Sequence, residues 1–326
     1  MGRLDELRRF VTKDALGIEV APYFNPTVSK ADGYNVLIVD VFDTDKLRGN
    51  ARGDPNIPDD RITEIEEVDL VSDASQLLDI VRSKDLCSKV DYIVSSHNFE
   101  HLPDPISFLQ GCSEALVPGG VLTMAIPDCR ACFDHFRMPT RLSDWLSAYH
   151  RGLTQPSPEN LFDHASNHAP HSLEVNRFIP VRNLKAAYDQ YLSDIDEPGS
   201  YRDTHCSVVF GESFELMVRD LKYLGLIDLE VVEISPSMGI EFFAHLRKPD
   251  AKANNRPADQ SEEVFFAKRL DLMRQTNFYG GSKHGAKGPE NRRAKRLARK
   301  ILGPALMQNL SDLNARRRAK RKSSSK

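Results

Sequence analysis

Short apolar runs, rich in β-branched side chains, recur through the first part of this sequence and restrict the folds open to it. They lie at residues 16–20, 36–40, 68–71, 90–95 and 121–126. Apolar and polar residues mostly do not alternate strictly within them, which is typical of parallel strands buried on both faces. Consecutive parallel strands need a crossover segment between them, and helices are the usual crossovers.

One crossover helix is marked by its end signals. Asp104 is a good N-cap and Pro105 suits the first turn, so the sequence predicts a helix between the fourth and fifth runs. The turn residues Pro118-Gly119-Gly120 are expected to end it. A strand, a helix and a second strand in this order indicate a right-handed crossover in an α/β sheet.

Regular structure returns near the end of the folded part. Apolar spacing predicts a helix that ends at Gly225, and residues 229–234 and 240–246 predict a hairpin across Ser235-Pro236-Ser237. We therefore expect an α/β fold with a doubly wound, mostly parallel seven-stranded sheet that ends in an antiparallel hairpin. The polar residues at about 128–204 predict a helical and loop insertion after the fifth strand.

Charge is distributed unevenly along the 326 residues. Residues 283–326 hold 15 Lys and Arg against two acids, a net +13, whereas residues 1–282 carry −16. We therefore expect a folded domain at 1–248, a polar linker at 249–262 and a basic helical or disordered tail at 263–326.

Several features predict a soluble, cytoplasmic protein. No uninterrupted apolar run approaches the roughly 20 residues of a membrane span. The opening MGRLDELRRF lacks the apolar core of a secretory signal. Five scattered cysteines suit a reducing compartment better than a disulfide framework.

Acidic residues stand at the ends of three expected strands. Glu19 lies at the end of the first run, Asp40 ends the second and Asp73 follows the third. Ligands of open α/β sheets bind beyond the carboxyl ends of the strands. Carboxylates there can accept hydrogen bonds from ribose hydroxyls and an exocyclic amine, which suits a nucleoside. The alternative for any one of these residues is that it only caps a helix.

The segment VDYIVSSHNFEHLPDPISFLQGCSEALVPGGVLTMAIPD resembles the fourth-strand to fifth-strand region of class I S-adenosylmethionine-dependent methyltransferases of the type 11 group. GIEVAPYFNP and YNVLIVD stand where that family has its first two motifs, and the resemblance covers roughly residues 14–248. It implies S-adenosyl-L-methionine as cofactor and methyl transfer as the activity.

The resemblance also implies roles for residues at the strand ends. It places Glu19 near the cofactor's methionine end, Asp40 at the ribose hydroxyls and Asp73 at the adenine amine. The segment from Ser95 to His97 would line the floor near the sulfonium. The residues that it assigns to cofactor binding are Glu19, Ala21, Asp40, Asp73, Ala74, Ser95 and Ser96.

The first motif departs from the family pattern. The family has Gly-x-Gly after the acid, which lets the backbone approach the cofactor, but this chain has Ala21 and Tyr23 there. Two functions follow: an active methyltransferase, or a catalytically inactive methyltransferase-like protein that binds or scaffolds through its tail. A NAD-dependent dehydrogenase is disfavoured, because no G-x-G-x-x-G follows the first strand.

Transfer to a hydroxyl needs a general base within hydrogen-bonding reach. His97 is the first candidate because it follows the fourth strand, and His101, Asp128 and His164 come next. The alternative for His97 and His101 is that they pin the turn by hydrogen bonding. We expect the acceptor to be an oxygen on a sugar, a polysaccharide or another small polar molecule.

The insertion contains histidines at a spacing that can bind a metal when helical. The residues concerned are Asp163, His164, His168, His171 and, downstream, His205. Pro170 and the polar context favour a loop instead, and a lone Cys129-x-x-Cys132 is weak evidence, so no metal is expected. Arg130, Asp134 and Arg137 form a segment suited to face the acceptor.

The tail predicts helices at 262–275 and 290–313. Its basic amphipathic character allows binding to an anionic membrane surface or an anionic polymer, or packing on the acidic body. Nucleic acid is a further possibility through phosphate contacts, but no interleaved aromatic run supports base stacking. Peripheral membrane association is thus an expectation of the sequence.

Overall fold

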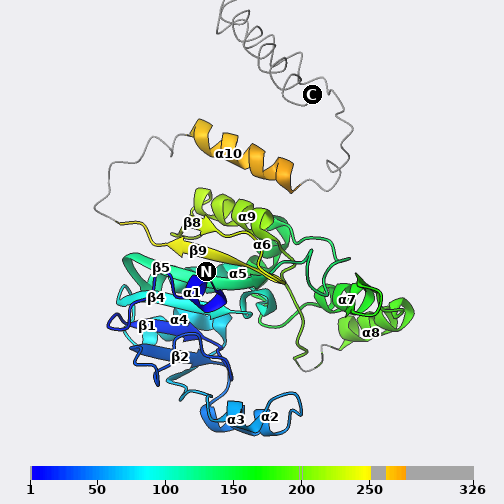
Figure 1. Cartoon of the computed structure of the whole chain (residues 1–326). Helices are drawn as coiled ribbons and strands as arrows, with labels where there is room; N and C mark the ends of the chain where they lie inside the picture. Colours follow the sequence, from blue (N-terminus) through cyan, green and yellow to red (C-terminus); the bar gives the residue numbers. More distant parts are fainter. Residues whose placement is uncertain (1, 198, 200, 251–261, 277–326) are drawn as a thin grey trace, which may run out of the picture. The chain divides into compact units, whose positions relative to one another are not determined.

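Figure 1 presents a computed structural model of the chain, which describes residues 2–197, 199, 201–250 and 262–276. The chain divides into Met1–Thr276 and Asn277–Lys326. The predicted helix at 290–313 and the basic end of the tail lie outside the described residues. The predicted division at 248 and 262 stays a prediction.

A seven-stranded sheet forms the centre of the first unit, in the order β3-β2-β1-β4-β5-β9-β8. Five neighbouring strands are parallel, while β9 is antiparallel to β5 and β8 is antiparallel to β9. The strands are β1 Gly17–Val20, β2 Val36–Asp40, β3 Leu70–Val71, β4 Val90–Ser96, β5 Leu116–Pro127, β8 Glu230–Ile234 and β9 Glu241–Arg247. The predicted fold class, including the final antiparallel hairpin, is confirmed.

Two helices around the sheet form where the sequence predicts them, the crossover helix α5 Pro105–Ala115 and the late helix α9 Gly211–Tyr223. The predicted end of the first at Pro118-Gly119-Gly120 was wrong, because β5 already begins at Leu116 and contains these residues. Asp104 Oδ1 accepts hydrogen bonds from the backbone of Ile106 and Ser107, both at 3.1 Å, and thereby caps α5. Gly225 ends α9 with a φ of +71°. The helices outside the insertion are α1 Arg3–Leu7, α2 Thr44–Arg52, α3 Asp59–Ile62, α4 Leu77–Ser83, α5 Pro105–Ala115 and α9 Gly211–Tyr223, with short 3-10 turns at η1 Ala74–Gln76 and η2 Phe99–His101.

Apolar residues cover both faces of the sheet, as the uninterrupted strand runs predict. On β4, Ile93 points into the larger core with α5 and α9, whereas Tyr92 and Val94 point into a smaller cluster that includes Leu7 of α1. All four are at most 1% exposed. Because β4 is buried on both sides, its carboxyl end has a defined position.

The connection from β1 to β2 differs from the usual crossover. Residues 21–35 contain turns and bends but no helix. Val28 from this segment packs into the smaller cluster on the sheet, where it is fully buried. In this crossover a loop therefore covers the sheet with an apolar side chain, as helices do in the other crossovers.

The insertion after β5 is more regular than the sequence predicts. It contains α6 Leu142–Arg151, α7 Pro158–Asn167, the short pair β6 His171–Ser172 and β7 Arg177–Phe178, and α8 Leu184–Asp196. Helices α7 and α8 pack side by side (Figure 1). The expectation of a loop around Asp163 and His164 was wrong, because Ser157 caps α7 and Pro158 occupies its first turn.

The predicted helix at 262–275 is confirmed as α10 Glu262–Gln275. It packs on α9, where Phe265 stacks on Tyr223 at 4.1 Å between ring centroids and Arg269 pairs with Asp220 at 2.8 Å. Within the described residues, no helix has both the length and the apolar character needed to cross a membrane.

Candidate functional site at the carboxyl edge of the sheet

The candidate site lies where β1, β2 and β4 end together. Val20 pairs with Val39 of β2 on one side and with Ser95 of β4 on the other. The chain runs outward from β1 to β2 and β3 and then returns to β4 on the other side of β1, so the strand order reverses there. Such a reversal is where ligands bind in open α/β sheets.

The loop after β1 has a glycine-like backbone without glycine. Ala21 has a φ of +49° and Tyr23 a φ of +48°, at the two positions where the resembling family has glycine. The left-handed region costs roughly 1–2 kcal/mol for an L-residue. Strained residues of this kind cluster at binding sites.

The buried Glu19 carboxylate accepts hydrogen bonds from the backbone of this loop. Its carboxylate oxygens accept hydrogen bonds from Thr27 N at 2.6 Å and Val28 N at 3.1 Å, and the residue is 1% exposed. Burial raises the pKa of Glu19 to about 7, against the effect of the two backbone donors. Both oxygens serve the loop, so this geometry argues against direct contact between Glu19 and a cofactor.

Asp40 is buried at the end of β2, with 5% of its surface exposed. Its Oδ1 accepts a hydrogen bond from Phe42 N at 3.2 Å, and among the described residues it has no basic partner within ion-pairing distance. Burial raises the pKa of this carboxyl. Tyr23 packs its ring against the apolar cluster of α2 and α3, and burial, followed by the charges of Asp54 and Asp40, raises its pKa.

Asp73 follows the capping alternative. Its Oδ1 accepts a hydrogen bond from Ser75 N at 2.7 Å and caps the short turn η1, which starts at Ala74. The side chain thus has a structural role beside the end of β3. Contact of Asp73 with an adenine amine, and cofactor binding by Ala74, remain predictions.

The residues at the end of β4 contact α1 and β9. Ser96 Oγ accepts a hydrogen bond from Arg3 at 2.6 Å, and Ser95 Oγ accepts one from Asn98 at 3.3 Å. His97 adopts a φ of +50°, and its Nε2 lies 2.7 Å from Glu241 on β9.

The surroundings of His97 argue against its predicted role as a base. Its Nδ1 lies 3.4 Å from Glu100 Oε1, opposite the contact to Glu241. The Glu100 and Glu241 carboxylates raise the pKa of His97 to about 9, and this outweighs burial. The ring is therefore protonated at neutral pH and cannot accept a further proton.

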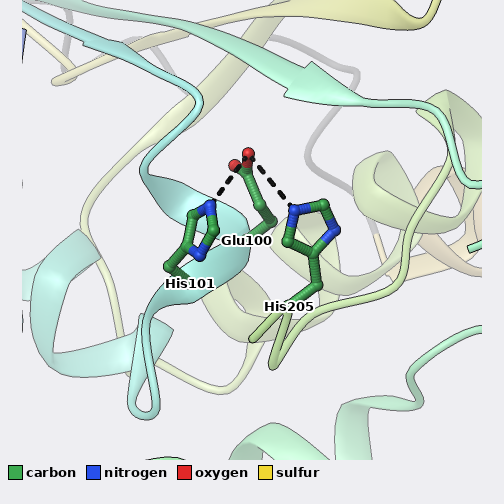
Figure 2. Close-up of side chains that lie close together, drawn as sticks. All are labelled: Glu100, His101 and His205. Carbon is green, nitrogen blue, oxygen red and sulfur yellow. Dashed lines mark ion pairs between the residues drawn. The ribbon is translucent and has the colours of Figure 1, made fainter. Parts of the chain in front are cut away.

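A carboxylate surrounded by histidines lies directly after β4. Figure 2 shows the Glu100 side chain pointing between the rings of His101 and His205. Glu100 Oε1 lies 3.7 Å from Nε2 of His101 and 4.0 Å from Nε2 of His205. Glu100 is 1% exposed, and neither of its oxygens has a hydrogen-bond partner.

Further acids orient the two rings. His101 Nδ1 lies 2.7 Å from Asp203, and His205 Nδ1 lies 2.6 Å from Asp134. Burial lowers the pKa of His101, but the bond to Asp203 and the charge of Glu100 leave it raised. For Asp134, burial raises the pKa of the carboxyl, but the contacts with His205 and then Arg137 outweigh burial and lower it to about 2.

The main chain brings His205 to this place. The Glu100 carbonyl accepts hydrogen bonds from Cys206 N at 2.6 Å and Ser207 N at 3.0 Å, which joins the end of the insertion to η2. Arg137, 1% exposed at its side chain, donates to the His205 carbonyl at 3.0 Å. The contact of His205 with Glu100 cannot be predicted from the sequence, because contact between distant segments leaves no local pattern.

Two other predicted bases lie in different surroundings. Asp128 forms an ion pair with Arg130 at 2.6 Å and accepts a hydrogen bond from Ser237. These bonds lower the pKa of Asp128 although burial opposes them. Burial, followed by the charge of Arg137, lowers the pKa of His164 to about 4, and its ring packs against Phe133 at 5.8 Å. A general-base role for either stays a prediction.

Comparisons with known proteins find likenesses in fold only. No protein-family model matches the sequence, and no curated protein does. A S-adenosylmethionine-dependent methyltransferase from Methanosarcina mazei matches with 12% identity, 75% of this chain, 97% of its own chain and a TM-score of 0.38. A methyltransferase of the same kind from Mesorhizobium loti is 13% identical, and the match covers 76% of this chain and 98% of that chain with a TM-score of 0.40. A putative Zn-dependent alcohol dehydrogenase from Rhodobacter sphaeroides is 10% identical, and the match covers 76% of this chain and 88% of that chain with a TM-score of 0.42.

Proposed function

We propose that this protein is an S-adenosyl-L-methionine-dependent methyltransferase whose acceptor is an oxygen on a sugar, a polysaccharide or another small polar molecule. The observation that carries the proposal is Asp40. It is a buried carboxylate beside the strand-order reversal, and no basic side chain of the described residues neutralises it. Two ribose hydroxyls can supply the donors that such a carboxylate needs.

The loop after β1 supports the same ligand. Ala21 and Tyr23 keep a left-handed backbone at the two positions, so the loop can follow the path that glycine allows in the family, although neither residue is glycine. The Tyr23 ring packs against the α2–α3 cluster, and, after burial and the charge of Asp54, the charge of Asp40 contributes to its raised pKa.

The reaction itself asks for orientation and one proton transfer. The acceptor oxygen forms a bond to the methyl carbon while the carbon–sulfur bond breaks, and the sulfur keeps the electron pair. The acceptor hydroxyl passes its proton to a carboxylate oxygen of Glu100, which has no hydrogen-bond partner among the described residues. We place the acceptor oxygen near Glu100, His101 and His205, because this cluster directly follows β4 and gathers groups that can bind a polar oxygen.

Calorimetric titration with S-adenosylmethionine tests the proposal. We expect saturable binding by the full chain, and Asp40→Asn should weaken it about 10- to 100-fold, because hydrogen bonds to a charged group are worth about 1.5–3 kcal/mol. Asp43→Asn is the matched control. Asp43 caps α2 through a bond to Lys46 N, and Asn caps helices equally well. Binding that Asp40→Asn leaves unchanged contradicts the proposed site.

A second function is favoured by the loop after β1: residues 21–35 contain no helix, and both Glu19 oxygens accept hydrogen bonds from the loop backbone. The chain then lacks a helix N-terminus after β1 to receive an anionic group of the cofactor. This suits a catalytically inactive protein that binds or scaffolds a partner. Absence of saturable S-adenosylmethionine binding by the folded chain would favour this function over the enzyme.

A further inference from the structure

Glu100, His101 and His205 form the one group of potential metal ligands found among the described residues, with donor atoms within 4.8 Å of one another. We propose that they bind a divalent transition-metal ion through one carboxylate oxygen and the Nε2 atoms of both imidazoles. Two histidines and one carboxylate suit Zn²⁺, Fe²⁺ or similar ions, whereas Mg²⁺ and Ca²⁺ prefer oxygen ligands alone.

The spacing of the donors fits such an ion. Bonds of about 2.0–2.2 Å to a tetrahedral Zn²⁺ leave neighbouring ligand atoms roughly 3.3–3.5 Å apart. Glu100 Oε1 lies 3.7 Å from His101 Nε2 and 4.0 Å from His205 Nε2. All three donor atoms lie within 4.8 Å of one another, so side-chain rotations must bring the donor pairs closer by roughly 0.2–1.5 Å to reach the ligand spacing of Zn²⁺.

The two rings are already oriented for binding. Metal-binding histidines usually donate their other ring N–H to a carboxylate, which fixes the ring and leaves the second nitrogen for the metal. His101 has this contact with Asp203 at 2.7 Å, and His205 has it with Asp134 at 2.6 Å. Each Nε2 therefore faces Glu100, as Figure 2 shows.

The Glu100 carboxylate supplies independent support for a bound cation. It is 1% exposed, and neither of its oxygens has a hydrogen bond, which is unfavourable for a buried carboxylate even beside the His97 ring. No Lys or Arg of the described residues lies within 4.0 Å of it, and the nearest nitrogen, His97 Nδ1 at 3.4 Å, faces only Oε1. A metal ion would satisfy the carboxylate directly.

Three protein ligands leave at least one position for another molecule, as in catalytic zinc sites. An acceptor oxygen bound there would be polarised by the ion. This use in methyl transfer rests on the proposed function, whereas metal binding by itself does not.

Metal titration of the full chain tests the inference. We expect chelator-treated protein to bind one equivalent of Zn²⁺ by calorimetry and to develop visible absorption bands with Co²⁺. His101→Gln should weaken Zn²⁺ binding at least 100-fold, and Asp203→Asn about 10- to 100-fold. Asp203 is 68% exposed at its side chain, so its variant should fold normally. His150→Gln, at an exposed position of α6, is the control and should bind as the wild type does.

Circular dichroism of each variant shows whether it is folded, and binding of S-adenosylmethionine is measured on the same samples. Loss of Zn²⁺ binding in folded His101→Gln supports the site whether or not the cofactor binds. Absence of stoichiometric binding of both Zn²⁺ and Co²⁺ to the wild type overturns it. So does binding that His101→Gln and Asp203→Asn leave unchanged.

Discussion

Replacement of Glu19 by Gln should change how the stability of this protein depends on pH. Glu19 experiences two opposing effects: burial favours its neutral form, while hydrogen bonds from Thr27 N and Val28 N favour its charged form. Burial dominates and raises the pKa to about 7, whereas the ordinary value is 4.5. The difference corresponds to about 3 kcal/mol of folding free energy.

The sign follows from proton binding. Because the pKa of Glu19 is raised on folding, the folded chain holds this proton more tightly than the unfolded chain does. The protonated side chain thus contributes its full stabilisation below pH 4.5, and the contribution is lost as the pH rises through about 7. Gln carries no titrating proton, so Glu19→Gln lacks this dependence.

Urea unfolding of both proteins at pH 5, 6, 7 and 8 measures the effect. The free energy of unfolding of the wild type, minus that of Glu19→Gln, should fall by about 2–3 kcal/mol from pH 5 to pH 8. Glu174→Gln, at an exposed position of the insertion, should give a curve parallel to the wild type. A difference for Glu19→Gln that stays constant with pH would show that the backbone donors cancel burial, and one that grows with pH would show that they outweigh it.

Three further substitutions test the packing that supports the site. Gly17→Ala should destabilise the protein by about 1–3 kcal/mol in urea unfolding, because the new Cβ would lie 2.0 Å from the ring of Tyr92. A neutral result would contradict this close approach. Arg137→Met should cost about 3–5 kcal/mol in the same assay, since it removes a buried ion-pair partner, and a loss below 1 kcal/mol would refute the assigned role. Phe265→Ala removes the stacking on Tyr223 and should speed proteolytic cleavage within α10, and unchanged cleavage would mean that this contact does not hold the helix.

Local sequence patterns predict most of the sheet. Runs such as 36–40 are buried on both faces, so their composition is set by the strand itself and not by a distant partner. The capping of α5 by Asp104 and the end of α9 at Gly225 depend on neighbouring residues in the same way. Pro170 and the polar residues around His164 favour a loop, but Pro170 lies beyond the end of α7, and Pro158 occupies the first turn of that helix.

For the candidate site, the sequence indicates which residues reach the edge of the sheet but not what they contact. Asp40 has to end at this edge because it closes β2. The use of Glu19 by the loop and the position of His97 between two carboxylates depend on residues brought together by folding. Their pKa values follow from those neighbours and from burial, neither of which can be seen in a local pattern.

Short-range periodicity and end signals in the sequence are sufficient to predict the strands of the sheet, the helices α5, α9 and α10, and acids at the strand ends. Only the tertiary structure decided that Ala21 and Tyr23 adopt glycine-like backbone angles and that His205 lies beside Glu100. In the second case the insertion returns to η2 through hydrogen bonds to the Glu100 carbonyl. Contacts between distant segments depend on how the whole chain packs, so they leave no periodic trace in the residues that make them.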